Sequence, residues 1–162
     1  MVWKSDPELP LSQNGLRVLG APIGHPLYIV DQLDSKSAEH ELLFQRIPAA
    51  EDLQAAWLLL LFCGATRANF WLRMIQPDLS LPFAQRHDDR VWGCFTTLIH
   101  VPTQLPHART TALMPLSKGG LGLGNAVRAR HAAHCASWAD SLPMVRQRHP
   151  DVAGHHHHGS RA

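Results

Sequence analysis

The chain has 162 residues, and 45% of them are hydrophobic, which is enough to build one domain around an apolar core. Its longest apolar run, residues 55–63, is too short to span a bilayer, and its acidic, proline-containing start differs from a signal peptide. The three cysteines lie far apart and form no C-x-x-C motif, which favours reduced thiols. We therefore expect an intracellular protein, nuclear or cytoplasmic, that does not enter a membrane.

Basic residues are concentrated toward the C-terminus. The formal net charge is +2, but residues 1–52 carry four basic and eight acidic groups, a balance of −4. Residues 53–100 carry four and three, a balance of +1, and residues 101–162 carry seven and two, a balance of +5. A basic C-terminal third favours contact with a polyanion such as nucleic acid, although the same bias also serves solubility alone.

The first elements expected along the chain are an extended lead-in and a β-hairpin. Residues 1–14 are rich in Pro, Ser and Asn, which is typical of extended chain. Residues 15–25 contain the stretch GLRVLGAPIG, in which side chains alternate in character, Gly20 interrupts the pattern and Gly24 closes it. This pattern predicts a short hairpin with a tight bend.

Residues 26–101 have the apolar spacing of a helical bundle. From Pro26, apolar residues recur as in a helix of about five turns. The strongest pattern runs over residues 51–75 and is apolar nearly all round between 55 and 63, so we expect the central, most buried helix there, ended by Pro77. A third helix is expected from Pro82, which suits a first helical turn, to His100.

Residues 102–150 are expected to form a connecting segment. Its prolines predict a loop with one short helix over residues 106–113, and the glycine-rich stretch KGGLGLGN follows. A last helix is expected over residues 125–142, with Asn125 as its N-cap and Pro143 interrupting it. Residues 151–162 contain the run HHHH, part of a tag or of a natural tail, and are expected to be disordered. The predicted fold class is mainly α, a helical bundle with a short N-terminal β-hairpin.

The glycine-rich stretch does not fit a nucleotide-binding motif. A dinucleotide fingerprint requires G-x-G-x-x-G directly after a strand, but Asn125 stands where the third glycine belongs. A P-loop ends in Gly-Lys-Ser/Thr, whereas Lys118 precedes the glycines here. The residues favour a turn before a helix, and no cofactor is expected.

Two other groups of residues have the spacing of metal ligands. Asp88 and Asp89 are adjacent, but consecutive side chains on a helix point about 100° apart, so a solvated helix surface is expected for both. His131, His134 and Cys135 recur at i, i+3 and i+4 on one helix face, which suits zinc, yet spacing marks no fourth ligand. These three stay candidate metal ligands, and no catalytic residues are predicted.

Two separated stretches resemble the reverse transcriptases of non-LTR (LINE-type) retrotransposons. The stretch GLRVLGAPIG is similar to the primer-grip hairpin of that family, and LMPLSKGGLGLGNAVRARHAAHCASWADSL to the segment after its thumb. Between them, DLQAAWLLLLFCGATRANFWLRMIQP and FAQRHDDRVW are similar to the thumb region in order and length. The resemblance covers about residues 14–148. It implies that the glycine-rich stretch is a connector, because glycine accepts positive φ and close backbone packing.

The resemblance implies a part of an RNA-directed DNA polymerase that holds the primer–template duplex. The family's Ala-Asp-Asp motif after an aromatic residue is absent, and so are the upstream fingers and the endonuclease. The chain therefore resembles a C-terminal fragment that begins at about the primer grip. We expect it to have no polymerase activity alone, and its partners would be nucleic acid and the missing palm and fingers.

The resemblance also implies roles for single residues. Leu19, Gly20 and Gly24 correspond to the primer grip. A thumb holds duplex through phosphates, using Lys and Arg, so the following residues are expected to bind nucleic acid: Arg67, Arg73, Lys118, Arg128 and Arg130. One alternative is a helical protein-interaction module or a retroelement remnant, with apolar surface exposed where a palm would pack. The other is a small metal-binding helical protein built on the two histidines and the cysteine above.

Overall fold

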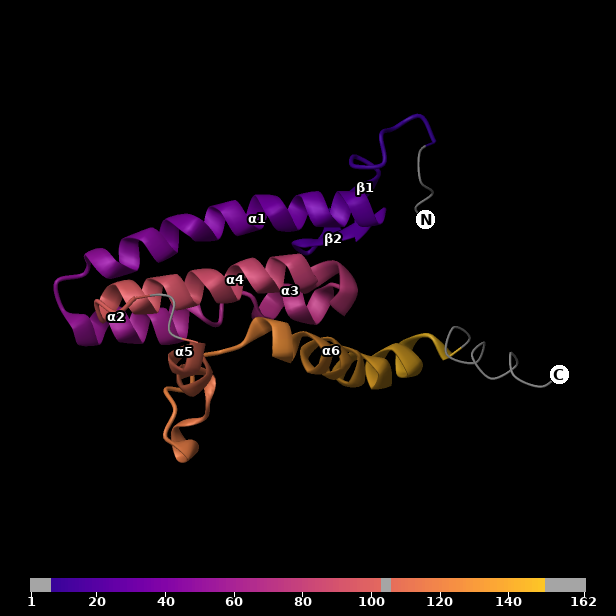
Figure 1. Cartoon of the computed structure of the whole chain (residues 1–162). Coiled ribbons are helices and arrows are strands. Elements are labelled where there is room, and N and C mark those ends of the chain that lie inside the picture. The colour runs from indigo at the N-terminus through magenta and orange to yellow at the C-terminus, as the bar shows by residue number, and fades with distance from the viewer. Residues whose placement is uncertain (1–6, 103–105, 151–162) are drawn as a thin grey trace.

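Two long helices that lie side by side form the frame of the fold (Figure 1). The computed structural model describes residues 7–102 and 106–150, and the frame consists of α1 (Pro26–Arg46) and α4 (Pro77–Leu98). A 3-10 turn (Ile47–Ala49) follows α1. The predicted fold class, mainly α with a short N-terminal hairpin, is confirmed.

The hairpin expected near the N-terminus lies at one end of this frame (Figure 1). β1 (Gly15–Val18) pairs antiparallel with β2 (Ala21–Gly24), and a two-residue turn at Leu19 and Gly20 connects them. Both turn residues have positive φ, 50° and 88°, which matches the twist that a two-residue hairpin requires. β2 packs against α1, so the hairpin is fixed to the helical frame.

The segment expected to be the central, most buried helix is broken into shorter pieces, and that prediction is wrong. α2 (Leu53–Leu59) leads into a π-helical turn (Leu60–Gly64), and residues 65–68 separate this turn from α3 (Asn69–Met74). Only one side meets the rest of the fold: Leu60 is fully buried, whereas the nearby Phe62 is 66% exposed. When a helix is apolar on all sides, its sequence does not indicate which side packs against another helix.

By length and composition alone, Leu53–Met74 could cross a membrane. The core helix of a water-soluble protein passes the same test, and here the stretch packs on α4 and buries both Leu60 and Leu72. The turn at residues 65–68 also interrupts the helix. The stretch is therefore weak support for a membrane span.

The helix that contributes most to the core is α4, and it begins earlier than expected. Pro77, predicted to end the preceding helix, occupies the first turn of α4, where an N–H would lack a helical partner in any case. Pro82, predicted as the start, lies inside the helix. Buried residues of α4 join two apolar clusters: one includes Phe44, Ile47, Leu60, Val91, Trp92 and Phe95, and the other Leu33, Trp71, Leu72, Ile75, Phe83 and Ala84.

The C-terminal part follows the expected order of elements. α5 (Pro106–Leu113) confirms the short helix, and a 3-10 turn (Leu116–Lys118) and the glycine-rich stretch lead to α6 (Ala126–Arg148). The predicted end at residue 142 is wrong, because Pro143 lies inside α6, as proline does in kinked helices. The tail expected at residues 151–162 and the start of the lead-in lie outside the described residues.

Candidate nucleic-acid interface

The hairpin tip is narrow and exposed. Leu19 is 96% exposed, and Gly20 lies beside α3, since a Cβ placed on it would come 3.8 Å from the Phe70 ring. Gly24 pairs with Gly15 across the strands, and a side chain at Gly24 would collide with the backbone at the start of β1. The three residues of the expected primer grip thus shape a tight hairpin whose tip presents a leucine.

Arg67 and Arg73 lie close in sequence but in different environments. Arg73 of α3 forms an ion pair with Asp140 of α6, with 2.8 Å between nitrogen and oxygen. Arg67 lies in the turn before α3, is exposed, and makes no ion pair within the part of the chain that the structure describes. Arg67 is therefore open to a phosphate, whereas Arg73 already has an acidic partner.

Three further candidate cations lie around the start of α6. Lys118 and Arg128 are exposed, and neither makes an ion pair among residues 7–102 and 106–150. The guanidinium of Arg130 is half-buried and donates a hydrogen bond to the backbone oxygen of Val127. Of the five predicted cations, Arg67, Lys118 and Arg128 are thus the most accessible to a ligand.

Asp88 is not a solvated surface residue, and that prediction is wrong. It is 7% exposed, and its carboxylate oxygens accept hydrogen bonds from the amides of Ala126 (2.7 Å) and Val127 (3.0 Å). These amides belong to the first turn of α6, where the helix offers them no partner and its dipole favours a negative charge. Burial raises the pKa of Asp88, against the opposing effect of the two hydrogen bonds. Asp89 is exposed, as expected, and pairs with Arg109 of α5.

The glycine-rich stretch is a tight connector into α6. Gly119 and Gly122 have positive φ, 78° and 67°, and a Cβ on Gly120 would overlap the carbonyl oxygen of Met114. The stretch ends at Asn125, whose side-chain oxygen accepts a hydrogen bond of 2.7 Å from the amide three residues later. The predicted N-cap is confirmed, and the glycines serve a close backbone turn.

His131, His134 and Cys135 do not come together as a metal site. Within the described residues, no group of three His, Cys, Asp or Glu side chains could hold a metal ion. His134 is half-buried, and its Nε2 accepts a hydrogen bond of 3.0 Å from the Trp138 indole, whereas His131 and Cys135 are exposed. Shared spacing on a helix face is therefore not sufficient to assemble ligands here.

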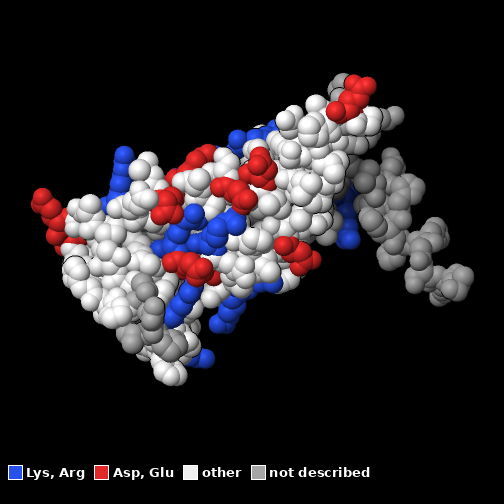
Figure 2. All heavy atoms as spheres, turned by 45° about the horizontal axis from the view of Figure 1, so that its top comes forward, with Lys and Arg blue, Asp and Glu red and all other residues white. Residues whose placement is uncertain are grey.

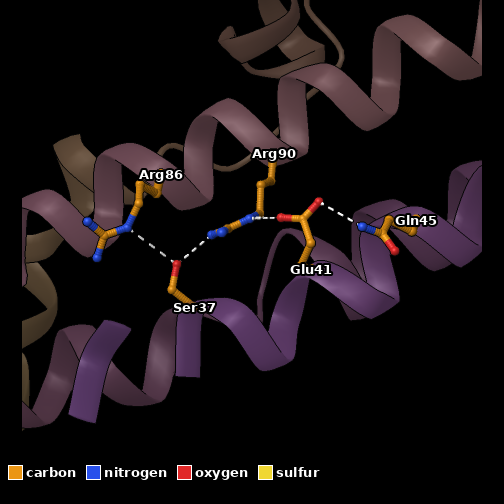
Figure 3. Close-up of polar contacts among 5 residues, drawn as sticks. All are labelled: Ser37, Glu41, Gln45, Arg86 and Arg90. Atoms are coloured by element: carbon orange, nitrogen blue, oxygen red, sulfur yellow. Dashed lines mark hydrogen bonds and ion pairs between the residues drawn. The ribbon is translucent and has the colours of Figure 1, made fainter. Parts of the chain in front are cut away.

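A row of polar side chains between α1 and α4 is not predicted by the sequence patterns above (Figure 3). The hydroxyl of Ser37, which is 2% exposed, accepts hydrogen bonds from Arg86 (3.4 Å) and Arg90 (2.5 Å). Arg86 also pairs with Asp34, and Arg90 with Glu41, so the two helices run in the same direction. Complementary i, i+4 spacings on both helices are the sequence signal that could have revealed this row.

The face over α1 and α4 carries mixed charges. Figure 2 shows Lys and Arg atoms near its centre with Asp and Glu atoms close around them. Both arginines of the row described above have an acidic partner, which competes with any polyanion for the same guanidinium groups. The arginines of this face are therefore less available to a nucleic acid than Arg67, Lys118 and Arg128, which form no ion pair with another described residue.

Two buried histidines lie between α1 and α4. His40 is 6% exposed and His87 is 2% exposed, with 6.4 Å between their ring centroids. Burial, then the charge of His87, and then that of Arg67 lower the pKa of His40 to about 4. Burial also lowers the pKa of His87, whose Nε2 lies 3.2 Å from the carbonyl oxygen of Ala65 and donates to it. Burial thus favours the neutral form of both rings.

The described residues offer a tight hairpin and a set of exposed cations, and among them no group of side chains that could hold a metal ion. A comparison of the chain with models of protein families found no match, and comparisons with the curated proteins and with the solved structures found none either.

Proposed function

We propose that this chain is the primer-grip, thumb and connection part of a non-LTR retrotransposon reverse transcriptase, and that it holds a nucleic-acid duplex by its backbone. The order of the elements carries the proposal. A tight hairpin, β1–β2, is followed almost at once by the helix on which it packs, and the remaining helices follow in the order that the resemblance implies. Backbone contacts position a duplex without reading its sequence, so binding should not depend on sequence.

The proposed phosphate contacts are Arg67, Lys118 and Arg128. All three are exposed, and none makes an ion pair with another described residue. Arg73 and Arg130 contribute less, because the first already pairs with a carboxylate and the second donates to its own helix. A duplex needs no acidic partner to be displaced at the first three positions.

The proposal is tested by the affinity of variants for a duplex of arbitrary sequence. Replacing Arg67 and Arg128 together by Ala should weaken binding about tenfold or more at low salt, since two phosphate contacts are lost. The matched control is Arg109→Ala, which removes an arginine that already pairs with Asp89 and should change the affinity less than about twofold. Fluorescence anisotropy, on protein without residues 155–158, measures both. Equal effects of the two changes would overturn the assignment.

A protein-interaction module is a second candidate, and the exposed apolar surface favours it. Large apolar side chains with at least two fifths of their surface exposed include Leu19, Leu58, Leu59, Phe62, Phe70, Met74 and Trp138. Contiguous apolar surface on a protein often marks a contact with another molecule. Replacing Leu59 and Phe62 by Glu should raise solubility and leave duplex binding unchanged. A protein that binds no duplex at any salt concentration would favour this second function.

A further inference from the structure

The C-terminal part of α6 extends past the rest of the fold. Figure 1 shows it running out beyond α3 and α4 at the hairpin end of the molecule. The first part of α6 packs on α3 and α4, but every residue from 139 to 148 is exposed. The helix therefore continues for more than two turns with its side chains exposed, and Asp140 at the start of this part still pairs with Arg73 of α3.

This protruding part has little intrinsic support as a helix. Pro143 lies inside it, and an interior proline removes a backbone hydrogen bond and destabilises the helix. Short helices are marginal in water when no other element packs on them. A largely exposed helix that contains a proline gains stability when another molecule packs on it.

An apolar stripe runs along this part of α6. Trp138, Leu142 and Val145 recur at i, i+4 and i+7, on one side of the helix, and are 56%, 37% and 40% exposed. Trp138 also lines a groove of about 340 Å³, to which Ile23 of β2 and Met74 of α3 contribute. The stripe and the groove thus form one apolar track, long enough for the side chains of a helix at i, i+3, i+4 and i+7.

Positive charges flank the stripe on both sides. At about 100° per residue, Arg146 lies about 40° round the helix from Leu142 and Arg148 about 120° the other way. Asp140 lies about 160° from Leu142, on the far side, where it pairs with Arg73. A partner on the track therefore meets apolar side chains along the groove and the stripe, and guanidinium groups on either side of the helix near its C-terminal end.

We propose that this track binds an acidic amphipathic helix of another polypeptide. Large aliphatic side chains of such a helix would fill the groove and cover the stripe. Carboxylates beside them on the same helix would face Arg146 and Arg148. A duplex would use the two arginines but leave the apolar stripe uncovered. The inference goes beyond the proposed function because it concerns another class of partner, although the groove borders the β1–β2 hairpin.

Two labelled peptides test the proposal. One is an amphipathic helix with leucines at i, i+3, i+4 and i+7 and glutamates beside them, and the other carries lysines in place of the glutamates. Fluorescence anisotropy should show that the protein binds the acidic peptide and not the basic one. Trp138→Ala with Leu142→Ala should weaken binding about tenfold or more, because apolar anchors dominate such contacts. Amide hydrogen exchange over residues 139–148 should slow in the complex.

A charge reversal gives the sharpest discrimination. Arg146→Glu with Arg148→Glu should lower the affinity for the acidic peptide about threefold or more and raise that for the basic peptide. The matched control, Arg67→Glu with Arg128→Glu, should leave the affinity for both peptides unchanged while weakening duplex binding. The proposal is overturned if both peptides bind alike or the acidic one does not bind. It is also overturned if Trp138 and Leu142 mediate only binding to anionic vesicles or self-association.

Discussion

Replacing Asp88 by Ala should destabilise the fold strongly, because this buried carboxylate caps a helix that begins 38 residues later in the chain. It accepts hydrogen bonds of 2.7 and 3.0 Å from the first two amides of α6. A hydrogen bond to a charged group contributes about 1.5–3 kcal/mol, so two contribute about 3–6 kcal/mol. The desolvation that raises the pKa of Asp88 offsets part of this, and a loss of about 2–4 kcal/mol is expected.

Urea unfolding followed by circular dichroism measures this loss, and the neighbouring residue supplies the control. Asp89→Ala removes only an exposed pair with Arg109 and should cost about 1 kcal/mol or less. Asp88→Asn keeps one acceptor oxygen, so its loss should lie between the two. The amides of Ala126 and Val127 should also exchange faster in Asp88→Ala. The reasoning is refuted if Asp88→Ala and Asp89→Ala lose the same stability.

Three other predictions follow from burial and from the proposed function. His40 should contribute a loss of about 3 kcal/mol in the free energy of unfolding as the pH drops from about 6.5 to about 4, because the unfolded chain takes up a proton that His40, with a pKa of about 4 in the folded state, does not. Urea titrations across this range should show a smaller loss for His40→Gln. Leu60→Ala should cost about 2–5 kcal/mol in the same assay, because Leu60 is fully buried, and Leu59→Ala, at a side chain that is 42% exposed, should cost far less. The purified chain should extend no primer with Mg²⁺ and nucleotides, since metal-assisted phosphoryl transfer needs converging carboxylates. Primer extension by the purified chain that is lost in the single variant Asp89→Ala, whose fold should be intact, would contradict this.

Features that depend on neighbouring residues in the chain could be predicted from the sequence. The helix from Pro26 follows from apolar spacing, and Asn125 is a helix cap because its side chain reaches an amide three residues later. The glycine-rich turn follows from the same local logic. Two prolines, Pro77 and Pro82, both suit a first helical turn, so the start of α4 could not be fixed by that signal.

Features that depend on distant contacts could not be predicted. Asp88 meets an amide 38 positions away, and Arg73 meets Asp140, 67 positions away. Adjacent aspartates on a helix look like solvated surface until the neighbouring helix is in place. The uniform apolar run in Leu53–Met74 conceals which side packs, because only the tertiary arrangement decides that. The candidate interface could not be predicted for the same reason. Only the structure distinguishes arginines that form ion pairs from arginines that are exposed and unpaired among the described residues.

The dependence of duplex affinity on salt tests the central claim most directly. If Arg67, Lys118 and Arg128 each neutralise one phosphate, log affinity should fall against log salt with a slope of about −3 on B-form DNA. Replacing Arg67 and Arg128 by Ala should reduce that slope to about −1. The measurement is an anisotropy titration at several salt concentrations and at a fixed pH of about 8, on protein without residues 155–158. Absence of binding at low salt, or a slope that the double substitution leaves unchanged, would contradict the account.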